Sequence, residues 1–358
     1  MRILVLNNYP FQEVWEEIKQ GKKPAHHLYG VDVMEREGHE VILVPFRKSQ
    51  FWMKLSKWIS KIPFIEFGDL DQQVSALKML NQCDVVYSPC QTQTWLLSYL
   101  RVIGLVQKPI VSMGHHPFVK GRFPKLRIPF LRWSFAGTDA YPALSEYVAN
   151  EIRSLCKSTR TKPLFWGPDM RYYAYKPSLG NYVVVSGRTG RDYLTFGKAA
   201  SQTNVPSKII CLKRDYKDEF TSFGNNVEVV CHDKSIDYHE MCEIYQNARI
   251  IAIPFVHTHN LCGLTSLTDA LAMGKPVIMT KTEFIDLDIE KEGIGIWVES
   301  GDEEGWRNAI EKIYSDENLA QQMGLKARKL AESRLNYNEF SCDVIELLEK
   351  VVQKDKSN

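Results

Sequence analysis

The chain has 358 residues, of which 44% are hydrophobic and 25% charged, an ordinary composition for a soluble globular protein that is long enough for two domains. Its 45 basic and 43 acidic residues leave a formal charge of +2, which excludes a protein that binds nucleic acid through an overall positive charge. No apolar run reaches the roughly 18 residues that cross a bilayer, and the apolar start is too short for a signal peptide, so we expect a cytoplasmic protein.

Short apolar runs alternate with segments of helical period along the whole chain. In the first half, the predicted strands are 2–7, 40–46, 84–88 and 109–113. After a Pro/Gly/Ser connector, the pattern restarts with predicted strands at 182–187, 208–213, 226–231, 249–255 and 275–280. Such uniformly apolar strands are typical of parallel sheets covered on both faces. The sequence predicts an α/β fold with two Rossmann-like, doubly wound domains that bind ligands at the carboxyl edges of their strands, across a cleft.

The first candidate site is the stretch SGRTGRDY, residues 186–193, where a predicted strand gives way to a helix. Gly187 permits close approach of the backbone, and Arg188 and Arg191 carry guanidinium groups that stay protonated. A polyphosphate is the ligand that this combination favours. Two solvated surface arginines are the alternative interpretation of the stretch taken alone.

The second candidate site is the start of the helix predicted within NLCGLTSLTDALAMGKPVI, residues 260–278. The free N–H groups of Leu264, Thr265 and Ser266, together with the helix dipole, would form an anion pocket. Asp269, one turn further along, is placed to accept hydrogen bonds from sugar hydroxyls. An ordinary capped helix is the alternative, because Thr and Ser favour helix N-termini in any case.

The order of these motifs resembles the nucleotide-sugar domain of GT-B glycosyltransferases, particularly the large retaining family four, whose domain is the glycosyltransferase group 1 domain. The stretches that carry the resemblance are VVVSGRTGRDYLTFGKA, MCEIYQNARIIAIPF, TDALAMGKPVI and GIGIWVESGDEEGWRNAIEKIYSDENLAQQMGLKAR, within residues 182–340. Arg188 matches the family's arginine, and Arg191 stands where lysine is usual. The first half matches more weakly, through GHEV, SMGHHP, ALSEYVANEI and WGPDMRYYAYKP.

The resemblance implies an N-terminal acceptor-binding domain (1–175), which the basic and aromatic stretches described below make membrane-associated, a donor-binding domain (176–336) and a last helix (337–358) that crosses back to the first domain. It implies transfer of a sugar, with retention, from a nucleoside-diphosphate sugar to a lipid-linked or glycan acceptor in bacterial surface polysaccharide or glycolipid synthesis. No carboxylate nucleophile is then required, because the leaving phosphate helps to take the acceptor's proton.

The resemblance also implies roles for individual residues. His115 would face the donor sugar, and Leu261 stands where the family has the first of two glutamates, so Asn260 or His259 would contact the sugar ring instead. The expected catalytic residues are His115, Arg188 and Arg191. The expected donor-binding residues are Gly187, Asn260, Gly263, Leu264, Thr265, Ser266 and Asp269. The expected acceptor-side residues are His26, His27 and His116.

A metal ion is the rival to the two arginines as the source of positive charge. Asp69–Leu70–Asp71 and Asp286–Leu287–Asp288 each spell Asp-x-Asp, a pattern that other glycosyltransferases use to hold a divalent cation. Neither lies in a predicted donor loop. We therefore expect no metal and no cofactor, since the nucleotide sugar is a substrate.

Two stretches of the first half, 46–64 and 118–135, interleave basic and aromatic residues, and neither contains an acidic residue. Such stretches favour an anionic membrane surface, here the inner face of the plasma membrane, to which the protein would bind peripherally. Aromatic core residues covered by lysine side chains are the alternative, and a single-stranded nucleic acid is a weaker one. The expected membrane contacts are Lys54, Trp58, Lys61, Arg122, Lys125 and Arg127.

Two further functions compete with a glycosyltransferase. A nucleotide-sugar epimerase on the same architecture would convert the donor without any acceptor. A catalytically weak scaffold that binds nucleotide or membrane is suggested by the missing glutamate, although such a scaffold has little use for both Arg188 and Arg191.

Overall fold

The computed structural model describes residues 1–46, 49–59, 61–62, 67–121, 123–256 and 260–357. The chain forms two compact units. Unit 1 comprises Met1–Gln20, Ala25–Phe165 and Tyr337–Asn358, and unit 2 comprises Gly21–Pro24 and Trp166–Asn336. The break between Phe165 and Trp166 falls before the predicted boundary at residue 176.

Unit 1 contains a six-stranded parallel sheet in the order β2-β1-β3-β4-β5-β6. Its strands are β1 (Arg2–Val5), β2 (Glu40–Leu43), β3 (Val85–Ser88), β4 (Ile110–Ser112), β5 (Ala140–Ala143) and β6 (Arg160–Pro163). The four predicted strands are confirmed, and the prediction missed β5 and β6. Both carry a proline, and β6 is a polar edge strand, so neither has the apolar pattern of a central strand.

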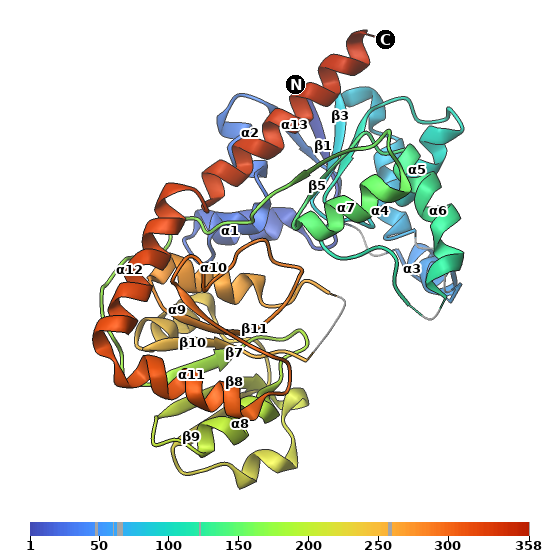
Figure 1. Ribbon diagram of the computed structural model, residues 1–358. Helices are drawn as coiled ribbons and strands as arrows, with labels where there is room; N and C mark the ends of the chain where they lie inside the picture. The colour runs from blue at the N-terminus through green and yellow to red at the C-terminus, as the bar shows by residue number, and fades with distance from the viewer. Residues whose placement is uncertain (47–48, 60, 63–66, 122, 257–259, 358) are drawn as a thin grey trace. The chain divides into compact units, whose positions relative to one another are not determined.

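The helices of unit 1 cover both faces of this sheet (Figure 1). They are α1 (Phe11–Lys19), α2 (Val31–Arg36), α3 (Gln50–Ile59), α4 (Leu70–Leu77), α5 (Trp95–Val102), α6 (Pro124–Ala136), α7 (Glu146–Leu155) and α13 (Tyr337–Ser357). One core cluster joins Trp95 of α5, Phe135 of α6 and Tyr141 of β5. Tyr337, the first residue of α13, accepts a hydrogen bond at 2.9 Å from the backbone N–H of Gly30, at the start of α2.

Unit 2 contains a second six-stranded parallel sheet, in the order β12-β11-β10-β7-β8-β9. Its strands are β7 (Val183–Ser186), β8 (Ser207–Leu212), β9 (Val227–His232), β10 (Ile250–Ile253), β11 (Val277–Thr280) and β12 (Gly295–Val298). All five strands predicted in this half are confirmed. The strand order reverses between β7 and β10, and ligands of such sheets bind at the carboxyl ends of the strands beside this switch point.

The helices of unit 2 are α8 (Tyr193–Ser201), α9 (Tyr238–Gln246), α10 (Leu264–Met273), α11 (Glu303–Ser315) and α12 (Glu317–Ser333). The main core cluster joins α8 and α11 to alternate strand residues, including Phe196, Trp306 and Ile250, so these two helices cover one face (Figure 1). Helix α10 packs against α12 and α9 (Figure 1). It ends, as predicted, at Gly274, whose φ of 63° suits glycine. The predicted fold class, two Rossmann-like parallel-sheet domains, is therefore confirmed.

Candidate functional site

The loop after β7 is built around a buried arginine. Gly187 has a φ of 136°, a backbone conformation that side chains disfavour, and the guanidinium of Arg191 lies against it. Nε of Arg191 donates to the carbonyl of Ser186 at 2.7 Å, and Nη2 donates to Oγ of Ser266 at 3.0 Å. Burial lowers the pKa of Arg191, but an arginine so bonded stays protonated near neutral pH. Arg191 therefore places a fixed positive charge between the loop and α10.

Arg188 differs from Arg191 in its exposure and in its hydrogen bonding. Its side chain is exposed, and it makes no hydrogen bond or ion pair with any residue in the described part of the chain. It leaves the loop at the carboxyl end of β7, beside the switch point. Arg188 is thus a cation available to a ligand, while Arg191 holds the loop.

The first turn of α10 lies at the end of the neighbouring strand, β10. Gly263 precedes the helix with a φ of 83°, and a Cβ atom on it would lie 2.7 Å from Cγ2 of Ile253. Among the described residues, the N–H groups of Leu264, Thr265 and Ser266 have no acceptor. Free N–H groups at a helix N-terminus attract anions, and the Arg191–Ser266 hydrogen bond joins this turn to the arginine loop. The two predicted loops therefore meet in one place.

Two further predicted donor residues, Asn260 and Leu261, lie in the segment between β10 and α10. Asn260 is half-buried and Leu261 is buried. His259, the other candidate for the sugar contact, lies outside the described residues. The role of Asn260 stays a prediction.

Asp269 is buried in α10 and is held by two tyrosines. Tyr173 donates to its Oδ1 at 2.6 Å, and Tyr238 donates to the same oxygen at 2.7 Å. Burial raises the pKa of Asp269 to about 6, while the two tyrosine hydroxyls oppose this shift. The sequence motifs single out neither tyrosine. No local spacing signals this arrangement, since the three residues are far apart in the chain.

In unit 1, the loop after β4 is tied to the loop after β3. The backbone N–H groups of His115 and His116 both donate to Oε1 of Gln91, at 2.9 and 2.8 Å. Nε2 of His115 donates to the carbonyl of Pro89, which leaves Nδ1 as the acceptor of a neutral ring. Burial lowers the pKa of His115 and takes that of His116 to about 4. Gln91 was not predicted, although it follows an apolar strand, which is the one signal that could have found it.

The residues around His115 include one backbone outlier. Tyr29 has a φ of 50°, the only positive value for a residue other than glycine in the described part of the chain, and its ring lies 5.4 Å from that of His115. Its carbonyl accepts a hydrogen bond from the hydroxyl of Tyr87 at 2.9 Å. Such conformations cost free energy and persist where surrounding contacts impose them.

The predicted acceptor-side role of His26 is corrected by its burial. His26 is fully buried, and burial lowers its pKa well below the usual value, so its neutral ring packs in the interior instead of meeting a ligand. His27 is half-buried, with its ring 4.7 Å from that of His26. The role of His27 stays a prediction.

Aspartates of both Asp-x-Asp stretches accept hydrogen bonds from other groups of the protein. Asp69 caps α4 by accepting the backbone N–H groups of Asp71 and Gln72, and Asp71 accepts that of Ser49 at 2.8 Å. Oδ1 of Asp288 accepts Nε1 of Trp297 at 3.2 Å. Within the described ranges, no three His, Cys, Asp or Glu side chains gather in a metal-binding group. That no metal is required stays a prediction.

The basic and aromatic stretches of unit 1 divide into exposed and buried parts. Helix α3 has no buried side chain: Trp58 is 64% exposed, and Lys54 is exposed, as are Lys61, just beyond the helix, and Lys125 in α6. Arg122 lies outside the described residues. No helix in the described part of the chain is long and apolar enough to cross a membrane.

Arg127 was predicted to contact a membrane, and this prediction is wrong. The side chain is only 4% exposed, its Nε donates to the carbonyl of Phe118 at 3.2 Å, and its guanidinium lies 5.9 Å from the ring of Trp95. The guanidinium of Arg127 therefore contacts groups inside unit 1 and not a membrane surface. The sequence could not reveal this, because α6 exposes its neighbours Lys125 and Leu126.

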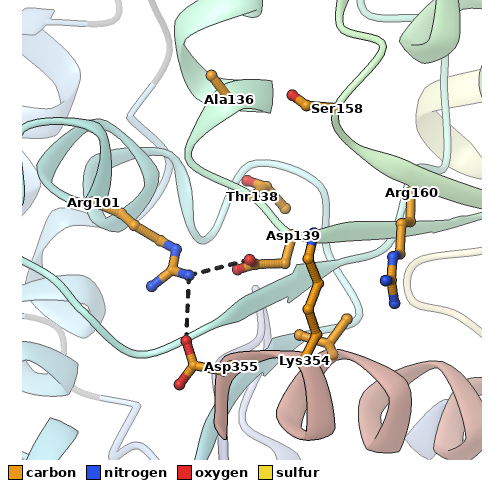
Figure 2. A pocket seen from close by; sticks show the side chains of 9 residues that line it. Arg101, Ala136, Thr138, Asp139, Ser158, Arg160, Lys354 and Asp355 are labelled. Atoms are coloured by element: carbon orange, nitrogen blue, oxygen red, sulfur yellow. Dashed lines mark hydrogen bonds and ion pairs between the residues drawn. The ribbon is translucent and has the colours of Figure 1, made fainter. Parts of the chain in front are cut away.

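A small pocket of about 190 Å³ lies elsewhere in unit 1, beside the C-terminal end of α13. Figure 2 shows Arg101 between Asp139 and Asp355, with ion-pair distances of 3.1 and 3.9 Å. Asp139 comes just before β5, so the pocket lies at the amino ends of the strands, the opposite edge from His115. Its charges fasten α13 to unit 1 and do not belong to the predicted site.

Comparisons with known proteins bear on the fold and on the second half of the chain. Residues 208–330 match the family model described as glycosyl transferases group 1. HepE from Anabaena, solved in complex with UDP, is 17% identical with a TM-score of 0.67, over 98% of this chain and 100% of that chain. Sucrose-phosphate synthase from Thermosynechococcus elongatus is 14% identical with a TM-score of 0.69, over 99% of each chain.

A third solved structure, WaaG, a glycosyltransferase involved in lipopolysaccharide biosynthesis, is 13% identical with a TM-score of 0.61, over 96% of this chain and 98% of that chain. No curated protein matches the chain. These similarities show the GT-B fold, and the family model identifies a glycosyltransferase domain within unit 2. The predicted GT-B fold is confirmed, and so is the predicted group 1 domain, over residues 208–330.

Proposed function

Because residues 208–330 form a glycosyl transferases group 1 domain in a GT-B fold, we propose that unit 2 binds a nucleoside-diphosphate sugar at the β7–β10 switch point. The observation that carries the proposal is the meeting of the arginine loop with the N-terminus of α10, through the 3.0 Å hydrogen bond from Arg191 to Ser266. A diphosphate fits this place because it offers oxygens to the free N–H groups of α10 and negative charge to Arg188. HepE, which shares the fold, was solved with UDP and with UDP-glucose.

The reaction that we propose is transfer of the sugar to an acceptor hydroxyl. The bond between the anomeric carbon and the diphosphate oxygen breaks, the acceptor oxygen bonds to the same carbon, and the acceptor's proton goes to the departing diphosphate. Negative charge develops on that diphosphate in the transition state, so fixed cations and N–H groups stabilise it. Arg188, Arg191 and the first turn of α10 have this role. The proposed stereochemical outcome is retention.

We propose that His115, in the loop after β4 of unit 1, binds a sugar hydroxyl. Its ring is neutral, because burial lowers its pKa, and its Nδ1 has no partner among the described residues. A neutral imidazole nitrogen accepts a hydrogen bond from a hydroxyl group. The hydrogen bonds from the His115 and His116 backbone to Gln91 hold this loop in place.

The acceptor that we propose is a lipid-linked sugar or glycolipid used in bacterial surface polysaccharide synthesis. Support comes from the exposed basic and aromatic residues of α3 and its flank, including Lys54, Trp58 and Lys61. Lysines attract anionic headgroups, and tryptophan prefers the membrane interface, so this surface suits peripheral binding to the inner face of the plasma membrane.

The first experiment is a thermal-shift measurement with UDP-, GDP-, TDP-, ADP- and CMP-linked sugars, because a ligand that binds the folded state raises the melting temperature. We expect one nucleotide class to stabilise the protein and Arg188→Ala to abolish that shift without lowering the melting temperature of the free protein. Arg334→Ala, which removes an exposed arginine paired with Glu292 in unit 2, is the matched control and should keep the full shift.

Turnover of the stabilising donor then separates the competing functions. Donor consumption that requires a lipid acceptor supports glycosyl transfer, whereas conversion without an acceptor indicates an epimerase. Stabilisation without turnover on any acceptor indicates a scaffold. No stabilisation by any of the nucleotide sugars at millimolar concentration would contradict the proposed donor site.

A further inference from the structure

We propose that Tyr173 and Tyr238 are positioning residues for the donor: they occupy Oδ1 of Asp269 and leave its Oδ2 as the acceptor for a hydroxyl group of the nucleotide sugar. This inference rests on the proposed function of unit 2. It gives a role to two tyrosines that belong neither to the predicted site motifs nor to the arginine loop.

The three side chains form a closed triangle of oxygens. The hydroxyls of Tyr173 and Tyr238 lie 2.6 and 2.7 Å from Oδ1 of Asp269, and 2.9 Å from each other. They come from three separate segments, because Tyr238 is the first residue of α9, Asp269 is in α10, and Tyr173 lies in the connector before β7. Two hydrogen bonds from two other segments restrict rotation of the carboxyl group, so Oδ2 has a defined direction.

The two oxygens of Asp269 differ in what they can still bind. Oδ1 accepts both tyrosine hydroxyls, whereas Oδ2 makes no hydrogen bond with any residue in the described ranges. Asp269 is 4% exposed, and its Oδ2 is not among the fully enclosed polar atoms, so this oxygen can still be reached from outside. A ligand hydroxyl that donates to Oδ2 would supply the missing hydrogen bond.

The number of protons available in the triangle makes the ligand's hydrogen bond to Oδ2 of Asp269 depend on pH. The triangle has three short oxygen contacts, but the two tyrosines carry only two protons, so a proton on Asp269 would complete the set when the site is empty. Burial raises the pKa of Asp269 to about 6, which agrees with this count. A ligand hydroxyl on Oδ2 favours the carboxylate instead. Donor binding near pH 6 should therefore release a proton and weaken as the pH falls.

Five ionisable side chains around Asp269 do not compete with it for protons near pH 6. Burial raises the pKa values of its ionisable neighbours, so they are neutral near pH 6; these are Tyr172, Tyr173, Tyr238, Cys242 and Tyr245. His239 stacks on Tyr172, with 5.6 Å between the ring centroids, and its Nδ1 lies 3.5 Å from the hydroxyl of Tyr172. Arg191 is bonded to Ser266, in the first turn of α10, and stays charged throughout.

The test compares Tyr173→Phe and Tyr238→Phe with Tyr172→Phe. The first two remove a hydroxyl from Asp269 and keep the ring, whereas the hydroxyl of Tyr172 contacts the carbonyl of Lys22 and Nδ1 of His239. Binding of UDP, GDP, TDP and ADP and of their sugars is measured by calorimetry from pH 5 to pH 8, in buffers of different ionisation enthalpy that report proton release. Melting temperatures are recorded alongside.

We expect Tyr173→Phe and Tyr238→Phe each to weaken binding of the favoured nucleotide sugar about 5- to 10-fold, the effect of one hydrogen bond to a charged group. Each should also raise the pH below which binding is lost, because the hydroxyl that stabilises the carboxylate is gone. Tyr172→Phe should keep both the affinity and the pH profile. Asp269→Asn should remove the proton release.

Two results would overturn the inference while the proposed function stands: wild-type binding that the two variants reproduce at every pH, or weaker binding that accompanies a lower melting temperature with an unchanged pH profile. The second result would mean that the tyrosines only support the fold. A wild-type protein that binds none of these nucleotides would instead overturn the proposed function, and the inference with it.

Discussion

The guanidinium of Arg191 occupies the space that a side chain on Gly187 would need. A Cβ atom on Gly187 would lie 2.3 Å from Nε of Arg191, far inside contact distance. Arg191 in turn is bonded to Ser266 at the start of α10. One glycine therefore sets the position of the arginine that joins the two loops of the proposed donor site.

Gly187→Ala should displace Arg191 and weaken both folding and donor binding. The φ of 136° and the collision with the guanidinium together predict a loss of about 2 to 3 kcal/mol in the free energy of unfolding, measured by urea denaturation. Gly301→Ala is the control: its φ is 77°, but a Cβ atom there meets nothing within 4 Å, so it should cost only about 1 kcal/mol. Equal losses in the free energy of unfolding for the two variants would show that the Arg191 side chain moves aside without cost.

Lys275 should contribute more to stability than any exposed lysine of unit 2. It is 1% exposed, and its Nζ donates to the carbonyls of Ser178, Gln246 and Ala248 at 2.9, 2.6 and 2.9 Å. Lys275→Met keeps the length of the side chain but leaves these carbonyls without a donor, so we expect a loss of about 3 kcal/mol in urea denaturation.

Lys312→Met is the control for Lys275, because Lys312 lies exposed in α11. A surface substitution of this kind should change the free energy of unfolding by no more than about 0.5 kcal/mol. If Lys275→Met lowered the free energy of unfolding as little as Lys312→Met, water would have to replace the ammonium group at the three carbonyls.

The stability of the protein should fall as the pH drops below 6.5, and His116 should account for part of this. Its pKa is about 4 in the folded state, against an ordinary value of 6.5, because burial and the neighbours His115 and Lys120 disfavour the charged ring. Between pH 6.5 and pH 4 the unfolded chain binds the additional proton, so stability is lost over that range, by about 3 kcal/mol in total.

His116→Asn should flatten this pH dependence, because asparagine does not titrate. The measurement is the free energy of unfolding from urea denaturation at several pH values between 4 and 8. A wild-type profile that the variant reproduces in full would mean that His116 is protonated in the folded state at its ordinary pKa.

The exposed face of α3 should bind anionic vesicles. We expect Lys54→Ala and Lys61→Ala each to weaken sedimentation with phosphatidylglycerol vesicles about 5-fold, since one basic residue contributes about 1 kcal/mol near an acidic bilayer. Trp58→Ala should weaken it as well. Leu325→Ser, at a leucine that is 50% exposed in α12 of unit 2, should have no effect. Equal binding to neutral phosphatidylcholine vesicles would contradict the proposed role of the lysines.

Local sequence pattern is sufficient to predict some elements of this protein and not others. The apolar runs of β7 and β10 and the glycines that follow them specify strands and turns through local preferences, so both donor loops could be predicted. The strands β5 and β6 could not, because a proline and a polar edge position hide them. Arg127 was misassigned for a similar reason, since its sequence neighbours are exposed although it is buried.

The sequence by itself determined the parallel α/β pattern, the group 1 motif order and the two loops that carry Arg188 and Ser266, because strand composition, glycine and helix caps act over a few residues. Only the tertiary structure decided that Arg191 is enclosed while Arg188 is exposed, and that Tyr173 and Tyr238 meet at Asp269. Burial and hydrogen bonding between distant segments make these distinctions, and they depend on how the strands and helices pack, which local pattern does not encode.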